Sequence, residues 1–369
     1  MARITFEAVP PGLANTVEGE TLMIRDHLLL LCLLLSCTTK TPAQDQSANA
    51  PANLGKITLN VVVTPKSGPP VADLQLQDFT ILDNKAPQTI NGFQVIDGRK
   101  GPISLIIVID SVNIGYQNVA RQRQEIERFL RSDGGRLAFP TTIAVAADKG
   151  IEIQPDFSQD GNAIAAALDK SDIGLRDLGR SAGFWGADER LGISLRSIHE
   201  LALTESARPG RKLVLWVSPG WPLLSGPGVE EQMTTKQEQD IFNQIVEFST
   251  LLRQARVTLY SVDPLGTADV GMRTFYWQSF VKGVTKPGQA LPGNLGLEVL
   301  AVQSGGLALN SSNDIAAQLQ KCVADAGAYY QISYDQPRGD QPRQYHHIEV
   351  RVDKKGLTAR TTQGYYAQP

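Results

Sequence analysis

The chain has 369 residues, a net charge of −3 and 42 % hydrophobic residues, a composition typical of a globular protein. This length allows one large domain plus a small one, and the near-neutral charge gives no reason to expect nucleic acid as a partner. Cys32 and Cys37 lie in an N-terminal apolar segment and Cys322 lies on a predicted helical face, so a disulfide framework within the folded part is excluded.

The first element is an apolar run from Leu28 to Leu35. It is shorter than the roughly 20 residues that span a bilayer, and it is typical of the core of a signal segment. Glu7, Glu18 and Glu20 precede this run in the full chain, whereas a start at Met23 leaves Arg25 in a short leading region. We therefore expect residues 1–36 to be a signal segment, with Met23 as the true start, and the protein to be exported.

The sequence LLSC, Leu34–Cys37, resembles the lipobox of bacterial lipoproteins. The resemblance implies cleavage before Cys37 and a lipid on this residue, so that the protein touches the membrane through its N-terminal lipid only. Ordinary cleavage after Ala43, which would release a soluble secreted protein, is the first alternative, and a buried core helix is the second. Residues 37–55 are polar and lack apolar periodicity, which predicts a tether.

Residues 56–98 form the next region and have the pattern of β-strands. Ile57, Leu59, Val61 and Val63 alternate with more polar residues, which predicts a half-buried strand. Further short strands are expected around the turn DNKAP. This region has too few strands to bury a core by itself.

The pattern changes at residues 102–326, where apolar strands alternate with helices. Continuous apolar runs predict strands covered on both faces at residues 103–110, 141–148, 212–220 and 256–266. Helical spacing of apolar residues predicts helices between and after them, at 118–132, 189–203, 239–255, 295–306 and 314–326. This alternation predicts an α/β fold with a doubly wound, mainly parallel, Rossmann-like sheet.

Residues 327–369 return to alternating strands, AYYQISYDQP and QYHHIEVRVDKKGLTARTTQGYYA, with turns between them. The two β regions flank one α/β domain in the chain. The simplest arrangement therefore pairs them into one small β-sandwich, formed by the N- and C-terminal strands.

This arrangement resembles the von Willebrand factor A (VWFA) domain superfamily, and most closely the exported VWFA-related proteins of Acidobacteria. The resemblance is carried by an ordered set of segments over residues 56–367: VADLQLQDFTILDNKAPQTINGF, LIIVIDSVN, VTLYSVDP, LEVLAVQSGG, YYQISYD and QGYYA. It implies the fold predicted above and a role in binding proteins.

The resemblance also implies a metal site, because VWFA domains commonly bind Mg²⁺ or Mn²⁺ through a first loop that reads Asp-x-Ser-x-Ser. Here Asp110 is present, but Val112 and Ile114 occupy the serine positions. Pro219 stands where the family offers an aspartate, and FWGADERLG contains no threonine where one is usual. The candidate ligands are therefore Asp110, Ser111, Asn113 and Ser218, in a degenerate site. The alternative is that Asp110 caps the next helix or accepts hydrogen bonds from loop amides.

Two other arrangements of polar residues are conceivable from the sequence. Ser218, His199 and Asp110 could be arranged as a hydrolase triad, but no Gly-x-Ser-x-Gly elbow surrounds Ser218. His346 and His347 are neighbours on a predicted strand and therefore point to opposite faces, which disfavours one shared metal ion.

A long stretch without regular periodicity, Asp263–Asn294, carries a cluster of aromatic residues. Long loops in compact domains are usually functional or disordered, and aromatic clusters often anchor interfaces. The alternative is that these residues cover the sheet as a minor core. Trp185 and Trp221 are predicted in loops near the same sheet edge. The candidate partner-binding residues are Trp185, Trp221, Phe275, Tyr276, Trp277 and Phe280.

Together these patterns predict a protein-binding module at the bacterial cell envelope, without a cofactor and without enzymatic activity, whose protein partner the sequence does not identify. The first alternative is adhesion through Mg²⁺ or Mn²⁺ at a rearranged Asp110 site. The second alternative is an envelope enzyme.

Overall fold

The computed structural model describes residues 55–170, 183–226, 233–266, 273–337 and 341–368. The predicted signal segment, Cys37 and the tether up to residue 54 lie outside the described residues. Within the described ranges, none of the helices is long and apolar enough to cross a membrane.

A seven-stranded sheet forms the centre of the α/β region, in the order β11-β10-β9-β5-β6-β7, with β8 paired to β6. The five strands from β11 to β6 are parallel, and β7 and β8 are antiparallel to β6. This confirms the predicted mainly parallel sheet. The strands are β5 (Ile103–Asp110), β6 (Arg136–Ala147), β7 (Gly150–Ile153), β8 (Ser158–Asp160), β9 (Arg211–Val217), β10 (Val257–Val262) and β11 (Ala308–Leu309).

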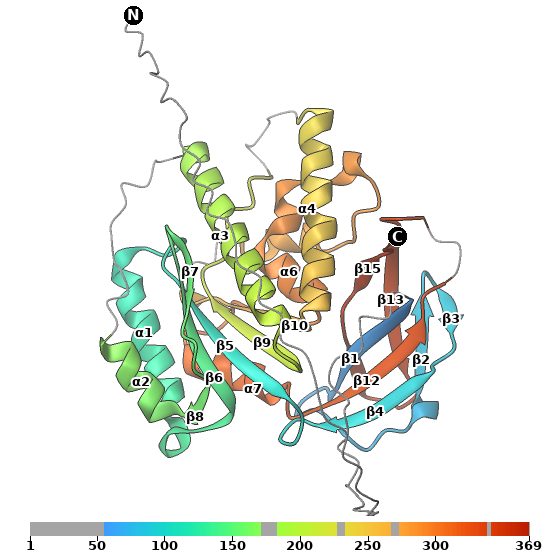
Figure 1. The fold of residues 1–369 in the computed structure, drawn as a ribbon, viewed down its shortest axis with the longest axis horizontal. Coiled ribbons are helices and arrows are strands. Elements are labelled where there is room, and N and C mark those ends of the chain that lie inside the picture. The colour runs from blue at the N-terminus through green and yellow to red at the C-terminus, as the bar shows by residue number, and fades with distance from the viewer. Residues whose placement is uncertain (1–54, 171–182, 227–232, 267–272, 338–340, 369) are drawn as a thin grey trace, which may run out of the picture. The chain divides into compact units, whose positions relative to one another are not determined.

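Helices cover both faces of this sheet (Figure 1). In β5, Ile106 and Val108 face α3, α4 and α6, whereas Leu105, Ile107 and Ile109 face α1, α2 and α7. The continuous apolar run of β5 is thus explained, because both sets of alternate side chains are buried. The helices are α1 (Tyr116–Leu130), α2 (Gly161–Lys170), α3 (Gly183–Ser206), α4 (Thr235–Gln254), α5 (Arg273–Tyr276), α6 (Leu297–Gln303) and α7 (Ile315–Ala324).

Two four-stranded antiparallel sheets form the β-sandwich, in the orders β14-β1-β12-β4 and β15-β13-β2-β3. Each sheet combines strands from both ends of the chain, which confirms the predicted sandwich. The alternating residues Ile57, Leu59, Val61 and Val63 of β1 all lie in its core. The strands are β1 (Lys56–Pro65), β2 (Phe79–Asp83), β3 (Ala86–Gln88), β4 (Gly92–Asp97), β12 (Ala328–Asp335), β13 (Tyr345–Val352), β14 (Leu357–Arg360) and β15 (Gly364–Tyr366).

One buried carboxylate, Asp83 at the end of β2, joins the two halves of the sandwich. Its Oδ2 atom accepts hydrogen bonds from the hydroxyls of Tyr334 (3.0 Å) and Tyr365 (2.8 Å). Its Oδ1 atom lies 2.6 Å from Nδ1 of His346, whose ring stacks on Tyr365. Burial raises the pKa of Tyr334 far above its ordinary value, and the neighbouring Tyr365 and Asp83 raise it further, so this hydroxyl stays a donor.

Candidate functional site

The order of strands reverses between β5 and β9, at the centre of the sheet. The chain passes from β5 through α1 to β6 on one side, and later builds β9, β10 and β11 on the other. Open α/β sheets place ligands at the carboxyl ends of the strands at such a switch point. The residues at this point are Asp110, the last residue of β5, and Ser218, directly after β9.

The side chain of Asp110 is buried and accepts four hydrogen bonds from the protein itself. Its Oδ1 atom accepts from the backbone N–H groups of Val112 (2.9 Å) and Asn113 (3.0 Å). Its Oδ2 atom accepts from the Asn113 side-chain amide (2.9 Å) and from the indole N–H of Trp216 (3.0 Å). Hydrogen bonds of this kind stabilise a carboxylate without a counter-ion. The carboxylate therefore shapes the loop that leaves β5, as one of the two interpretations from the sequence predicts.

Large apolar side chains fill the space next to this carboxylate. Trp216 lies in β9 on the sheet face that also carries Ile106 and Val108, and its ring meets that of Trp221 edge to face at 5.1 Å. Val112 and Ile114 are buried as well. The positions at which the resemblance implies serine ligands thus contribute to the core.

Each of the other three candidate ligands forms at least one hydrogen bond with the protein, although the buried Oδ1 atom of Asn113 has no partner among the described residues. Ser111 donates its hydroxyl to the carbonyl of Ala146 (2.9 Å), and the Ser218 hydroxyl oxygen accepts from the backbone N–H of Gly220 (3.2 Å). Asn113 turns its amide nitrogen, which is a donor, toward Asp110 and toward the hydroxyl of Ser194 (2.8 Å).

These donors do not fit Mg²⁺ or Mn²⁺, which prefer several oxygen ligands in an octahedron. A cation at Asp110 would face the amide of Asn113 and the indole of Trp216, and it would have to displace hydrogen bonds to both. Asp188 and Glu189, which could have supplied further carboxylates, are exposed on α3. In the part of the chain that the structure describes, no three His, Cys, Asp or Glu residues gather in a way that could hold a metal ion.

The six candidate aromatic residues do not form one surface. Trp221 is buried in the main core, and Trp277 and Phe280 are buried in a small cluster with Leu223 and Val299. For these three residues the expectation of a partner surface is wrong. Short helical turns at residues 273–280 place the rings of Trp277 and Phe280 in the small cluster, and Trp221 packs against Trp216. The minor core that the sequence left open as an alternative is the correct interpretation for Trp277 and Phe280.

Trp185 and Phe275 behave differently, because their side chains are 77 % and 64 % exposed. Trp185 lies in the first turn of α3 and not in a loop, so this helix begins before the predicted residue 189 although Gly183 and Gly186 oppose a helix. Phe275 lies in α5, on the segment that follows β10. Tyr276 is half-buried and packs edge to face on Phe280.

The start of α3 extends beyond the loop that follows β5. Ser194 of α3 contacts Asn113, and Trp185 lies nine residues earlier, which corresponds to about 14 Å along the helix axis. Phe184 meets Trp185 edge to face at 5.9 Å and is itself exposed. An apolar pair thus projects past the carboxyl ends of the strands.

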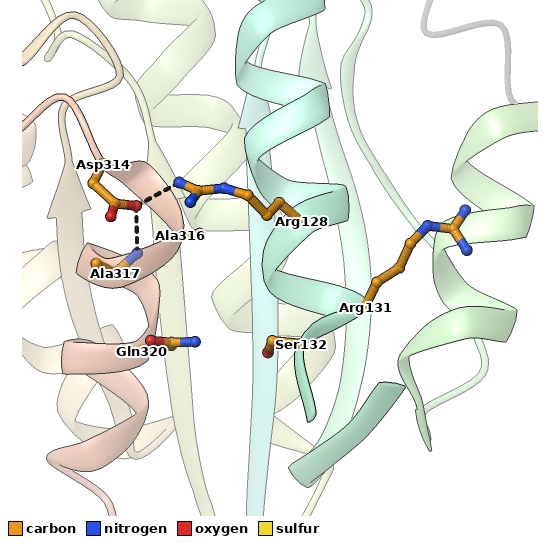
Figure 2. A pocket seen from close by; sticks show the side chains of 7 residues that line it. All are labelled: Arg128, Arg131, Ser132, Asp314, Ala316, Ala317 and Gln320. Atoms are coloured by element: carbon orange, nitrogen blue, oxygen red, sulfur yellow. Dashed lines mark hydrogen bonds and ion pairs between the residues drawn. The ribbon is translucent and has the colours of Figure 1, made fainter. Parts of the chain in front are cut away.

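A cleft of about 510 Å³ lies on the other face of the sheet, between α1 and α7. Figure 2 shows Arg128 reaching from α1 toward Asp314 at the start of α7, while Arg131 points away from Asp314. Arg128 pairs with Asp314 and Glu125, and Arg131 pairs with Asp169. The hydrogen bond from the backbone N–H of Ala317 lowers the pKa of Asp314, and the hydrogen bond from Arg128 lowers it further. Each arginine therefore already has a carboxylate partner, and the cleft presents no unpaired charge to a ligand.

The remaining histidine and cysteine candidates have structural surroundings. His199 lies 2.9 Å from Glu247 of α4, so its ring is directed toward that helix. His346 is buried beside Asp83, whereas His347 is exposed, as neighbouring strand residues should be. Cys322 is buried, and burial raises the pKa of its thiol above the ordinary value.

Sequence reasoning missed two residues of the site, Trp216 and Ser194. Both contact the loop after β5 from distant parts of the chain, 106 residues from Asp110 and 81 residues from Asn113. The alternation of β9 places Trp216 on one face, but only the register of β9 against β5 shows that this is the face of Asp110.

No protein-family model matches the chain, and no curated protein matches it. Among solved structures it is similar to the human COPII-coat protein Sec24c, with 11 % identity and a TM-score of 0.36 over 77 % of this chain and 48 % of that one. The chain thus spans about half the length of that protein. It is also similar to the SpRpn10 VWA domain (10 % identity, TM-score 0.28, 60 % of this chain and 94 % of that one). A third similar structure is the manganese-loaded Plasmodium vivax TRAP protein, with 10 % identity and a TM-score of 0.33 over 75 % of this chain and 98 % of that one. The closer relationship to exported VWFA-related proteins stays a prediction.

Proposed function

We propose that this chain is a VWFA-like protein-binding module that acts without a divalent metal ion and without catalysis. The observation that carries the proposal is the hydrogen-bonding of Asp110, whose two oxygens accept from two backbone N–H groups, an amide and an indole. A side chain that is engaged in this way cannot serve as a metal ligand or as a general base until these bonds break. In this proposal the carboxyl ends of the strands hold the partner-binding residues in fixed positions.

The partner-binding surface in this proposal is the apolar pair Phe184 and Trp185 at the start of α3, together with Phe275. Exposed aromatic side chains on rigid helices lose little conformational entropy on binding, and tryptophan is enriched among residues that dominate binding energy. These residues lie on segments that follow or project past the carboxyl ends of the strands, where α/β sheets present ligands. The proposed partner is a protein with an apolar pocket that accepts Trp185.

The proposal places the protein outside the cytoplasm, attached to the envelope by a lipid on Cys37. The support is the apolar run Leu28–Leu35 followed by LLSC. A Cys37→Ala variant should leave the membrane fraction and become soluble. If this variant stays in the membrane fraction with the wild type, the lipid anchor is wrong.

The binding surface is tested by chemical crosslinking of the envelope protein in cells, with Trp185→Ala, Phe275→Ala and a control. Leu203→Ala is the matched control, because Leu203 is also exposed on α3 but lies 18 residues, about 27 Å, further along the helix. We expect a specific crosslinked species that persists in EDTA, that weakens about 10- to 30-fold in Trp185→Ala, and that is unchanged in Leu203→Ala. Equal crosslinking in all variants, or loss of the species in EDTA, would contradict the proposal.

A further inference from the structure

A second cavity, of about 30 Å³, lies where α4 and α6 meet the segment between β14 and β15. It is lined by Ser249, Leu252, Arg253, Val257, Leu300, Gln303, Ser304 and Thr362. It therefore joins the α/β region to the β-sandwich. No acidic side chain is among its lining residues.

Arg253, in the last turn of α4, is the only residue of this lining that carries a charge. Its guanidinium makes no ion pair and no hydrogen bond with the described residues, and its Nε–H group is buried without an acceptor. The centroid of the Tyr365 ring lies 6.0 Å from the guanidinium carbon of Arg253. The side chain as a whole is half-buried, and partial burial of a cation without a counter-ion is unfavourable, because the protein replaces its hydration only in part.

Other residues at the cavity offer hydroxyl groups that could donate hydrogen bonds to a bound anion. The Ser249 hydroxyl also makes no hydrogen bond with the described residues, and Thr361, next to Thr362 in the chain, has a buried hydroxyl without a partner. Gln303 and Ser304 already donate to backbone carbonyls. Burial lowers the pKa of Arg253, which is the expected sign for a cation that lacks a nearby anion.

We propose that this cavity binds a small monovalent anion, of the size and charge of chloride, which neutralises Arg253. A volume of 30 Å³ admits a water molecule or a monatomic ion but is too small for sulfate, phosphate or a peptide carboxylate. A water molecule would satisfy the Nε–H group but would leave the charge uncompensated. The bound anion would stabilise the contact between α4 and the sandwich.

The test is thermal unfolding of the full chain in sodium chloride and in sodium gluconate at equal ionic strength, since gluconate is too large to enter. A ligand that binds only the native state raises the unfolding midpoint, and we expect a rise of roughly 3 °C in chloride. This rise should vanish in Arg253→Gln. It should remain in the control Arg256→Gln, because Arg256 is an exposed arginine of the adjoining turn.

Equal midpoints in the two salts, or a chloride effect that persists in Arg253→Gln, would show that only water occupies the cavity and would overturn the proposal. If Arg253→Gln fails to fold, anomalous diffraction from wild-type crystals soaked in bromide tests the proposal instead. An anomalous peak beside Arg253 supports the anion site, and its absence overturns it.

Discussion

Asp83 and Asp110 are both buried carboxylates at the last position of a strand, and among the described residues neither forms an ion pair with lysine or arginine. Asp110 takes three of its four hydrogen bonds from Val112 and Asn113, within three residues of itself. The Asp83 side chain takes its three partners among the described residues from more than 250 positions away. Two buried carboxylates at similar positions thus have different structural roles. Asp110 fixes the shape of one loop, whereas Asp83 holds the N- and C-terminal halves of the sandwich together.

The largest expected effect in this comparison is that of Asp83→Ala. The change leaves two tyrosine hydroxyls and His346 without their acceptor inside the core. We expect a loss of about 3–5 kcal/mol in the free energy of unfolding, measured by urea denaturation. The control is His347→Ala, next to His346 on β13, because the side chain of His347 is exposed and its removal should change stability by less than about 0.5 kcal/mol. Similar losses for both variants would refute the joining role of Asp83.

Asp110→Ala should have a smaller effect, of about 2–3 kcal/mol, because its local backbone donors can turn to water when the loop relaxes. The indole N–H of Trp216 then loses its acceptor, and its near-ultraviolet circular dichroism should change. Asp188→Ala, an exposed carboxylate of α3, serves as the control and should have almost no effect. A loss at Asp110 that equals the loss at Asp83 would remove the distinction between the two sites.

Lys212 differs from both aspartates, because it is a buried basic residue whose ammonium contacts no carboxylate among the described residues. It is 1 % exposed and its ammonium donates to the carbonyl of Arg208. Burial lowers its pKa from 10.5 to about 8. Between these values the unfolded chain binds the proton and the native chain does not, so stability rises with pH over the window from about 8 to 10.5.

The slope from this one group can reach about 1.4 kcal/mol per pH unit. The measurement is the unfolding free energy of the wild type and of Lys212→Met across this window. We expect the unfolding free energy of the wild type to increase relative to that of Lys212→Met as the pH rises. A difference between the two proteins that does not vary with pH would mean that Lys212 keeps an ordinary pKa.

The smallest effect on stability is expected for Trp185→Ala. The side chain is largely exposed, so its removal should change the unfolding free energy by less than about 0.5 kcal/mol. The same variant should lose partner binding, which separates a surface residue from a core residue. A large loss of stability would assign Trp185 to packing and would withdraw it from the proposed surface.

The sequence was informative about the fold because periodicity reports burial directly. The continuous run of β5 and the alternation of β1 both predicted the faces that they bury. The site was harder to predict, because its chemistry depends on contacts between distant segments. Asp110 was recognisable from its place after a strand, but its bond to Trp216 depends on the register of β9 against β5.

The burial of the aromatic residues was also hard to predict from the sequence. Trp185, Trp277 and Phe280 look alike in sequence, because each is an aromatic residue in a segment that is predicted to be a loop. Their burial depends on whether a turn folds the ring inward, and the tertiary packing that decides this has no local signal. The sequence could therefore identify the aromatic residues near the edge but could not separate anchors from core.

The central claim is that the carboxylate of Asp110 is held by the N–H groups of the protein and not by a metal ion. Thermal unfolding of the purified protein in Mg²⁺, Mn²⁺, Ca²⁺ or EDTA tests it most directly, because an ion bound to the native state must raise the midpoint. We predict equal midpoints in all four solutions. A rise in Mg²⁺ or Mn²⁺ that disappears in Asp110→Ala would contradict the account and would establish metal-dependent adhesion at this edge.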